Sequence, residues 1–297
     1  MLISKLPSIL YILGKIRTEF LFTLGIVITV SFLTKIFYAD IPEIPIAIPA
    51  FLGTAISVLL SFKLNQSYER WWEARKIWGS IVNESRSFTL QLQSFVANGN
   101  DKEIKQMAFR HIAWCFSLGQ SLRGLNPTEN LEKYISQDDI KIISKQNNKP
   151  LALLQLNTLQ IAQLKNEGKI DVFSQIQLNT TLVSFSDAMG MAERIKSTVF
   201  PVTYRIFLHL ALYIFVITLS VALNYMNPLF EIPLLLTITL GFFLLEKTAT
   251  HLQDPFENKP TDTAMTTIAT GIEINIKQLL NETDIPKPLQ PNSFYSL

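Results

Sequence analysis

Residues 49–88 read PAFLGTAISVLLSFKLNQSYERWWEARKIWGSIVNESRSF. The stretch begins with apolar residues of membrane character and passes into residues rich in Trp, Arg and Glu. Neither Gly nor Pro lies at the transition, and these two residues most strongly disfavour a helix interior. The stretch therefore predicts one long helix that starts in a membrane and continues into water.

Two rows of side chains run next to each other along the apolar half of this helix. One row consists of small residues spaced four apart, Gly53, Ser57 and Ser61. Such rows let membrane helices approach closely. The second row has the same spacing and therefore shares one face; it consists of Thr54, Val58 and Phe62. If several copies pack through the small row, the second row faces a central axis; the alternative is ordinary packing inside a single-chain bundle.

The composition of the 297-residue chain is typical of a membrane protein. Hydrophobic residues make up 48% and charged residues 17% of the chain, the mean hydropathy is +0.25, and 20 residues are Phe. The formal net charge of +2 is too small to predict nucleic-acid binding. The single cysteine, Cys115, excludes an intramolecular disulfide and a Cys-based metal site.

Four apolar segments are candidates to cross the roughly 30 Å hydrocarbon core of a bilayer. They cover residues 20–38, 46–62, 204–223 and 232–245, of which the last is short. The polar region between the second and third has apolar residues at helical spacing, with turns near 125–127 and 146–150 and a helix expected to be capped by Asp171. The expected parts are an amphipathic N-terminal segment with two membrane helices (1–64), a cytosolic helical region (65–199), two further membrane helices (200–247), and a C-terminal helix with a loose tail (248–297).

The distribution of positive charge predicts the orientation. Of the 26 Lys and Arg residues, 18 lie between Lys63 and Arg205, whereas the short turns at 38–45 and 224–231 have none. Positively charged segments tend to stay on the cytoplasmic side of a membrane. We therefore expect a multi-pass protein whose polar region and both termini are cytoplasmic.

The sequence carries no pattern that predicts catalysis. It has no nucleotide-binding GxxxxGK[ST] or GxGxxG motif and no zinc-binding HExxH motif, and its three histidines are far apart in the chain. The charged cluster of Arg70, Glu73, Arg75 and Glu84 has the spacing and mixed signs of helix-stabilising ion pairs and intersubunit contacts. His209 lies inside an apolar segment, where it either faces a cavity or is a neutral, hydrogen-bonded residue between helices. We expect no enzyme activity and no cofactor.

The polar half of the long helix, SYERWWEARKIWGSIVNESR, resembles the bestrophin family. The resemblance rests on a set of polar and aromatic residues together with small ones, Tyr68, Arg70, Glu73, Ala74, Arg75, Trp78, Gly79, Ser85 and Arg86. After the last apolar segment, Asp254, Pro255 and Phe256 are similar to the Asn/Asp-Pro-Phe motif of the family. Together with the order of apolar segments, the resemblance covers roughly residues 10–282.

The resemblance implies an all-α fold of four membrane helices and a large cytosolic helical region, assembled as a homopentamer around a central pore. Bestrophins are ion channels whose second membrane helix lines a narrow hydrophobic neck, and the neck positions fall on Thr54, Val58 and Phe62. The implied function is passive conduction of chloride or other small anions across a bacterial inner membrane. A channel for monovalent cations, a membrane scaffold and a lipid-modifying enzyme are the alternatives.

The family also implies a second restriction at the cytosolic mouth. Phe173 matches it best and Ile170 competes with it, unless Phe173 packs in the cytosolic core. Animal bestrophins bind calcium just after the Asn-Pro-Phe motif, where this chain has Asn258, Lys259, Pro260, Thr261 and Asp262, with Glu257 before them. Calcium prefers several oxygen ligands, and Lys259 opposes a cation. We expect no calcium clasp of the animal type and no other metal.

Overall fold

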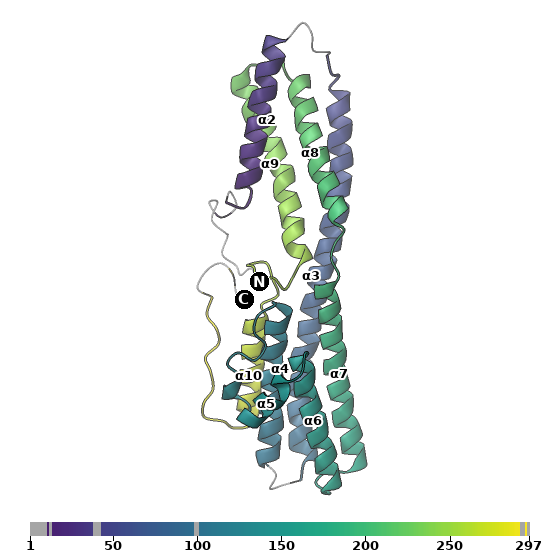
Figure 1. Cartoon of the computed structure of the whole chain (residues 1–297), viewed down its shortest axis with the longest axis vertical. Coiled ribbons are helices and arrows are strands. Elements are labelled where there is room, and N and C mark those ends of the chain that lie inside the picture. Colours follow the sequence, from purple (N-terminus) through teal and green to yellow (C-terminus); the bar gives the residue numbers. More distant parts are fainter. Residues whose placement is uncertain (1–10, 12–13, 38–42, 98–100, 292–294, 296–297) are drawn as a thin grey trace. The chain divides into compact units, whose positions relative to one another are not determined.

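The structure is a computed structural model that describes residues 11, 14–37, 43–97, 101–291 and 295. The predicted all-α fold is confirmed, because helices dominate these residues (Figure 1). In chain order the elements are α2 (Arg17–Ile36), α3 (Ala47–Phe95), α4 (Asp101–Leu122), η1 (Leu131–Lys133), α5 (Gln137–Ser144), α6 (Lys149–Asn166), α7 (Val172–Ser197), α8 (Val202–Ala222), α9 (Pro228–Gln253) and α10 (Met265–Leu279).

The chain forms two compact units, and α3 contributes to both. The first, which we call the membrane unit, contains residues 5–70 and 199–253, and the second, the polar unit, contains residues 71–198 and 254–297. The predicted long helix is confirmed, since the 49 residues of α3 include the whole of 49–88. The finer four-part division of the sequence stays a prediction.

In the membrane unit, α2, α3, α8 and α9 are each long and apolar enough to cross a membrane, as the four apolar segments predicted. Figure 1 shows α8 beside the first half of α3, and α2 contacts both α8 and α9. Their core is apolar and is formed by Val27, Ile56, Leu60, Leu208, Leu212, Val216, Leu235 and Phe243, among others. Because lipid tails are as apolar as these side chains, the contacts stabilise the unit through close packing and not through removal from water.

The fourth membrane helix is longer than predicted at both ends. It begins at Pro228, where the Asn227 side chain accepts a hydrogen bond from the Leu229 N–H at 3.0 Å, so the predicted turn at 224–231 is shorter. It ends at Gln253 rather than near 245, because Glu246 does not return the chain to polar surroundings but is buried. The predicted acidic turn at 38–42 lies outside the described residues.

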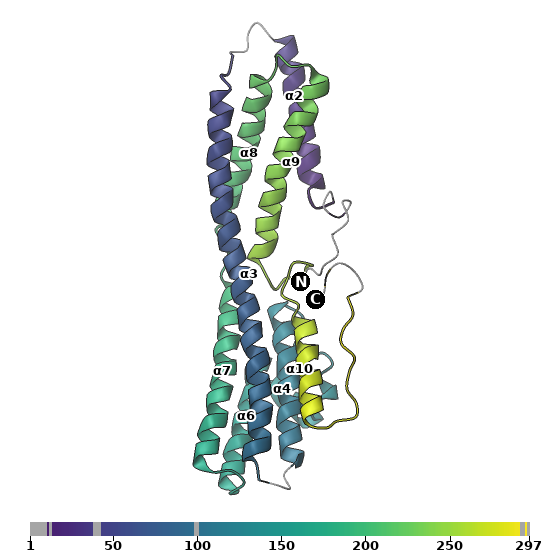
Figure 2. The same ribbon diagram turned by 180° about the vertical axis from the view of Figure 1, so that it is seen from behind.

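The polar unit packs the second half of α3 with α4, α6, α7 and α10 around large buried aromatic residues. Four of these are fully buried, Trp78, Phe88, Trp114 and Phe185. Figure 2 shows α10 beside α4, with which it makes extensive contact. The Asp171 carboxylate accepts a hydrogen bond from the Ser174 N–H at 2.7 Å, so the predicted cap of α7 is confirmed. Pro150, predicted in a turn, lies in the first turn of α6, where its missing N–H costs nothing.

Candidate functional site

The two sides of α3 differ sharply within the membrane unit. Ile56, Leu60 and Lys63 are buried against the other helices. The residues predicted to line a neck lie on the opposite side and are exposed: Thr54, Val58 (50% exposed) and Phe62 (62% exposed). The single-chain packing alternative therefore does not describe this row, which one chain leaves unpacked.

The threonine of this row is less polar than its residue type suggests. Its hydroxyl Oγ1 donates a hydrogen bond to the Ala50 carbonyl oxygen at 2.9 Å, so its donor is already used by the backbone of its own helix. Ser57 does the same, donating to the Gly53 carbonyl oxygen at 2.8 Å. The hydroxyl groups of Thr54 and Ser57 therefore have no donor left for an ion or a water molecule.

The small-residue row, predicted to allow close helix packing, divides between two environments. A Cβ atom at Gly53 would lie 3.1 Å from Cε2 of Phe215 on α8. That distance is shorter than nearly all real Cβ contacts, so Gly53 allows α3 and α8 to approach inside one chain. Ser57 and Ser61 are exposed. These two remain available for contact with another copy.

A buried ion pair holds the core side of α3 in the membrane unit. Lys63 Nζ lies 2.7 Å from Oε1 of Glu246 on α9, and both side chains are only 1% exposed. Thr250 Oγ1 closes the group, accepting from Lys63 Nζ at 2.8 Å and lying 2.9 Å from Glu246 Oε1. A buried pair of this kind is stable only when its remaining polar atoms find partners, and Thr250 supplies one.

The ion pair also explains the direction of the exposed row. Lys63 directly follows Phe62, and consecutive helix residues point about 100° apart, so fixing Lys63 toward α9 turns Phe62 away from α9, consistent with its exposure. The Tyr204 hydroxyl donates to the Leu59 carbonyl oxygen at 2.7 Å, which fixes α3 a turn earlier. Together with the close approach at Gly53, these contacts set the rotation of α3 about its own axis.

Sequence reasoning missed this pair, although a signal was present. The sequence predicts that α3 leaves the membrane at Lys63 and that the chain returns to water at Glu246. A charged residue inside a membrane usually pairs with a residue of opposite charge. Lys63 and Glu246 lie at the ends of two apolar segments, on the same predicted side of the membrane. Their opposite charges at the same predicted depth in the membrane were the signal that could have predicted the pair.

His209 lies at a helix interface and beside a charge. Its Nε2 atom is 3.3 Å from Glu246 Oε2, and its ring meets the Phe243 ring edge to face, with centroids 5.9 Å apart. A second ion pair, between Lys247 Nζ and Glu19 Oε1 at 2.7 Å, links α9 to α2. The interpretation of His209 as a simple neutral interface residue is therefore incomplete, because the ring contacts a buried carboxylate.

Three of the residues that carried the family resemblance make contacts inside one chain. Trp78 is fully buried, and Phe256 of the Asp254-Pro255-Phe256 motif is nearly so. Arg70 Nε donates to the Gln253 carbonyl oxygen at 2.9 Å, which ties α3 to the end of α9.

The charged cluster and its neighbour Tyr68 lie on the same helix. Glu73 forms an ion pair with Lys76, whose Nζ lies 2.6 Å from Glu73 Oε2 one turn further along α3. This pair has the i, i+3 spacing of a helix-stabilising contact, but Lys76 was not part of the predicted cluster, whose own ion pairs stay a prediction. Tyr68 is half-exposed.

The two residues considered for the cytosolic restriction separate clearly. Phe173, in the first turn of α7, is 83% exposed, so the alternative that it packs in the core is wrong. Ile170 is buried in the core of the polar unit and cannot line a surface in this conformation. Of the pair, Phe173 alone stays a prediction for the restriction.

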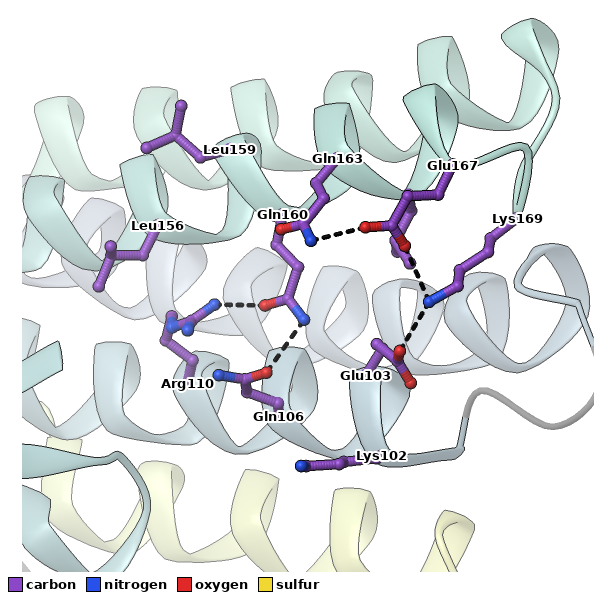
Figure 3. Close-up of a pocket in the computed structure, with 11 residues that line it drawn as sticks. Lys102, Glu103, Gln106, Arg110, Leu156, Leu159, Gln160, Gln163, Glu167 and Lys169 are labelled. Atoms are coloured by element: carbon purple, nitrogen blue, oxygen red, sulfur yellow. Dashed lines mark hydrogen bonds and ion pairs between the residues drawn. The ribbon is translucent and has the colours of Figure 1, made fainter. Parts of the chain in front are cut away.

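A polar cavity of about 520 Å³ lies between α4 and α6 of the polar unit (Figure 3). Lys169 Nζ bridges Glu103 Oε1 at 2.9 Å and Glu167 Oε2 at 2.8 Å, and hydrogen bonds from its ammonium lower the pKa of both carboxyl groups. Arg110 Nη1 donates to Gln160 Oε1 at 2.6 Å. These polar groups satisfy one another, so the cavity has the character of a structural network.

The segment after the Asp254-Pro255-Phe256 motif holds one buried acid. Asp262 is fully buried and accepts a hydrogen bond from the Lys259 N–H at 3.0 Å, while burial raises the pKa of its carboxyl group. Lys259 forms an ion pair with Glu257. Among the described residues, no group of three His, Cys, Asp or Glu side chains is placed to hold a metal ion. The expected lack of a calcium clasp stays a prediction.

The family follows from comparison with known proteins. Residues 8–278 match the family model described as Bacterial/Fungal Bestrophin protein. The chain belongs to the bestrophin family. This bestrophin is 28% identical to the Escherichia coli K12 protein named voltage-dependent anion channel-forming protein YneE, over 99% of this chain and 93% of that protein. A Ralstonia nicotianae protein named voltage-dependent anion channel-forming protein RSc3414 is 28% identical over 79% of this chain and 77% of its own.

A solved structure shares the fold of this bestrophin. The crystal structure of a bacterial bestrophin homolog from Klebsiella pneumoniae matches with a TM-score of 0.84 and 23% identity, covering 90% of this chain and 99% of that chain. The fold predicted from the resemblance is thereby confirmed. Because α2, α3, α8 and α9 are apolar enough to span a bilayer, this bestrophin is a membrane protein.

Proposed function

We propose that this bestrophin is a homopentameric channel that conducts chloride or other small anions passively across a bacterial inner membrane. The observation that carries the proposal is the exposed row of Thr54, Val58 and Phe62 on a helix whose opposite side is fixed by a buried ion pair. A row that one chain leaves unpacked, on a helix that cannot rotate freely, is suited to line an axis shared by several copies.

The row is suited to a hydrophobic neck. Val58 and Phe62 offer no charge that replaces the hydration shell of an ion, and the Thr54 donor is used by its own backbone. A constriction of this kind gates by dewetting and by small changes in its diameter. Phe173 is placed in the same proposal as a second apolar restriction, at the mouth formed by the polar unit.

The anionic substrate is supported by the names of the relatives, which describe anion channel formation. The family and these names point to a channel and not to an enzyme. The orientation, with the polar unit and both termini in the cytoplasm, is supported by the excess of Lys and Arg in 63–205. Lys259 places a positive charge, paired with Glu257, in the segment where animal bestrophins bind calcium. This charge opposes calcium binding and supports a channel that opens without calcium.

The sign of the permeant ion is tested by the reversal potential of the purified protein in a planar lipid bilayer under a KCl gradient, with and without calcium. We expect the current to reverse near the chloride equilibrium potential, at the same value in both solutions. Reversal near the potassium potential replaces the anion channel by a cation channel of the same fold. No current from intact pentamers favours the scaffold.

A further inference from the structure

A second polar cavity, unrelated to the exposed row of α3, lies within the membrane unit. It measures about 320 Å³ and is found between α8 and α9, where α8 begins and α9 ends. The residues that line it are mostly charged or polar, Arg205, Ile206, His209, Glu246, Lys247 and Thr250. All of them come from helices α8 and α9.

When the ion pairs around the cavity are taken into account, one positive charge has no acidic partner among the described residues. Glu246 is neutralised by Lys63 at 2.7 Å, and Lys247 is paired with Glu19 at 2.7 Å. Arg205 is exposed, and none of the ion pairs found in the described part of the chain includes it. The cavity is therefore suited to an anionic group that accepts hydrogen bonds from a guanidinium.

The start of α8 adds to this preference. Pro201 precedes the helix and provides no side-chain cap, so the first N–H groups of α8 lack a capping partner from that residue. The free N–H groups at a helix start carry partial positive charge and favour phosphate. Arg205 lies in this first turn, and His209 follows one turn later on the same face.

Apolar residues lead away from the cavity along α8. Ile206, Leu210 and Ile214 are exposed and recur every four residues. Eight residues of helix span about 12 Å, which is close to the roughly 15 Å of hydrocarbon in one leaflet. A cationic cavity at one end of an apolar track of this length is suited to an amphiphile, not to a free inorganic ion.

We propose that this cavity binds the phosphate of an anionic membrane phospholipid, with an acyl chain lying along Ile206, Leu210 and Ile214. Arg205 supplies the charge-assisted hydrogen bonds, which are the strong ones for a phosphate. Glu246 also lines the cavity, and its charge is balanced by Lys63 of α3, so the proposed site lies beside the ion pair that fixes the neck helix. The proposal rests on membrane insertion and not on conduction, so the two are tested independently.

The test uses the purified full-length protein in detergent, titrated with short-chain phosphatidylglycerol and, separately, with phosphatidylcholine of the same chain length. Binding is measured by native mass spectrometry. We expect preference for phosphatidylglycerol, and a loss of affinity of about tenfold in Arg205→Gln, the size expected when a strong interaction is removed. Arg205→Lys keeps the charge and is expected to retain part of the affinity.

Arg17→Gln is the matched control, because Arg17 is an exposed arginine in the first turn of α2 and outside the cavity. We expect it to bind phosphatidylglycerol as the unchanged protein does. Equal losses in the two variants would show only diffuse surface charge and overturn the proposal, as would equal affinity for the two lipids. Displacement of the lipid by an equal concentration of inorganic phosphate would overturn the lipid assignment.

Discussion

Replacing Lys63 by Met is expected to lower the free energy of unfolding by about 3–5 kcal/mol, the usual cost of removing one partner of a buried ion pair. The substitution leaves the Glu246 carboxylate buried at 1% exposure, with Thr250 and His209 as its remaining polar neighbours. The melting temperature Tm of the purified protein measures the loss, and a decrease of roughly 6–20 °C is expected.

Lys76→Met on the same helix is the matched control. Lys76 pairs with Glu73 at 2.6 Å, but both side chains are largely exposed, and an exposed pair contributes no more than about 1 kcal/mol. The double variant Lys63→Met with Glu246→Met is expected to regain much of the lost stability, since it leaves no buried charge alone. A Lys63→Met protein as stable as Lys76→Met, or simple addition in the double variant, would contradict a stabilising role of the pair.

Phe62→Ala is expected to raise single-channel conductance and to weaken closure. The phenyl ring of every copy leaves the neck at once, so the neck becomes wider and easier to wet. If the barrier to ion passage falls by only about 1.4 kcal/mol, conductance rises about tenfold. Single-channel recording in planar bilayers measures the change, after size-exclusion chromatography has established that the variant keeps its oligomeric state.

Phe32→Ala provides the matched control for this variant. Phe32 on α2 is 63% exposed and Phe62 is 62% exposed, so the two substitutions remove similar contacts from a single chain. Only the Phe62 change is expected to alter conductance. If Phe62→Ala and the unchanged channel have equal conductance, the assignment of Phe62 to the neck is wrong. If Phe62→Ala and Phe32→Ala change conductance equally, the effect is a general disturbance of the bundle.

The main helix was predictable because its sequence carries the information locally. Residues 49–88 have no helix breaker at the transition from apolar to polar, and α3 is continuous there. Thr54, Val58 and Phe62 share a face by spacing alone, and the structure leaves that face exposed. The Asp171 cap was predictable for the same reason, since the capping hydrogen bond spans only three residues.

The features that could not be predicted are contacts between residues distant in the chain. Spacing placed Gly53 with Ser57 and Ser61, but only the position of Phe215 decides that Gly53 packs inside one chain. The Lys63 to Glu246 pair joins residues 183 apart. Periodicity predicts a face but not the neighbour that covers it.

The same limit applies to the predicted cytosolic restriction. Ile170 and Phe173 are both large apolar residues on either side of the Asp171 cap, and only the packing of the polar unit buries one and exposes the other. The two residues are only three positions apart in the chain, yet one side chain meets the core and the other does not. Local sequence carries no signal for that difference, because both residues are large and apolar.

Whether the exposed row of α3 lines the conducting pore is tested most directly with Val58→Cys. The native Cys115 is buried, which raises the pKa of its thiol and keeps it inert, so the introduced thiol reacts alone. An anionic methanethiosulfonate reagent, whose charge suits an anion-conducting pore and repels anions once attached, is applied while current is recorded in a planar bilayer. Ile28→Cys on α2, an equally exposed position outside the row, is the control. We predict that current through Val58→Cys falls almost to zero and that Ile28→Cys and the unchanged channel keep theirs; undiminished current through Val58→Cys channels whose labelling is established by mass would contradict the assignment of this row to the pore.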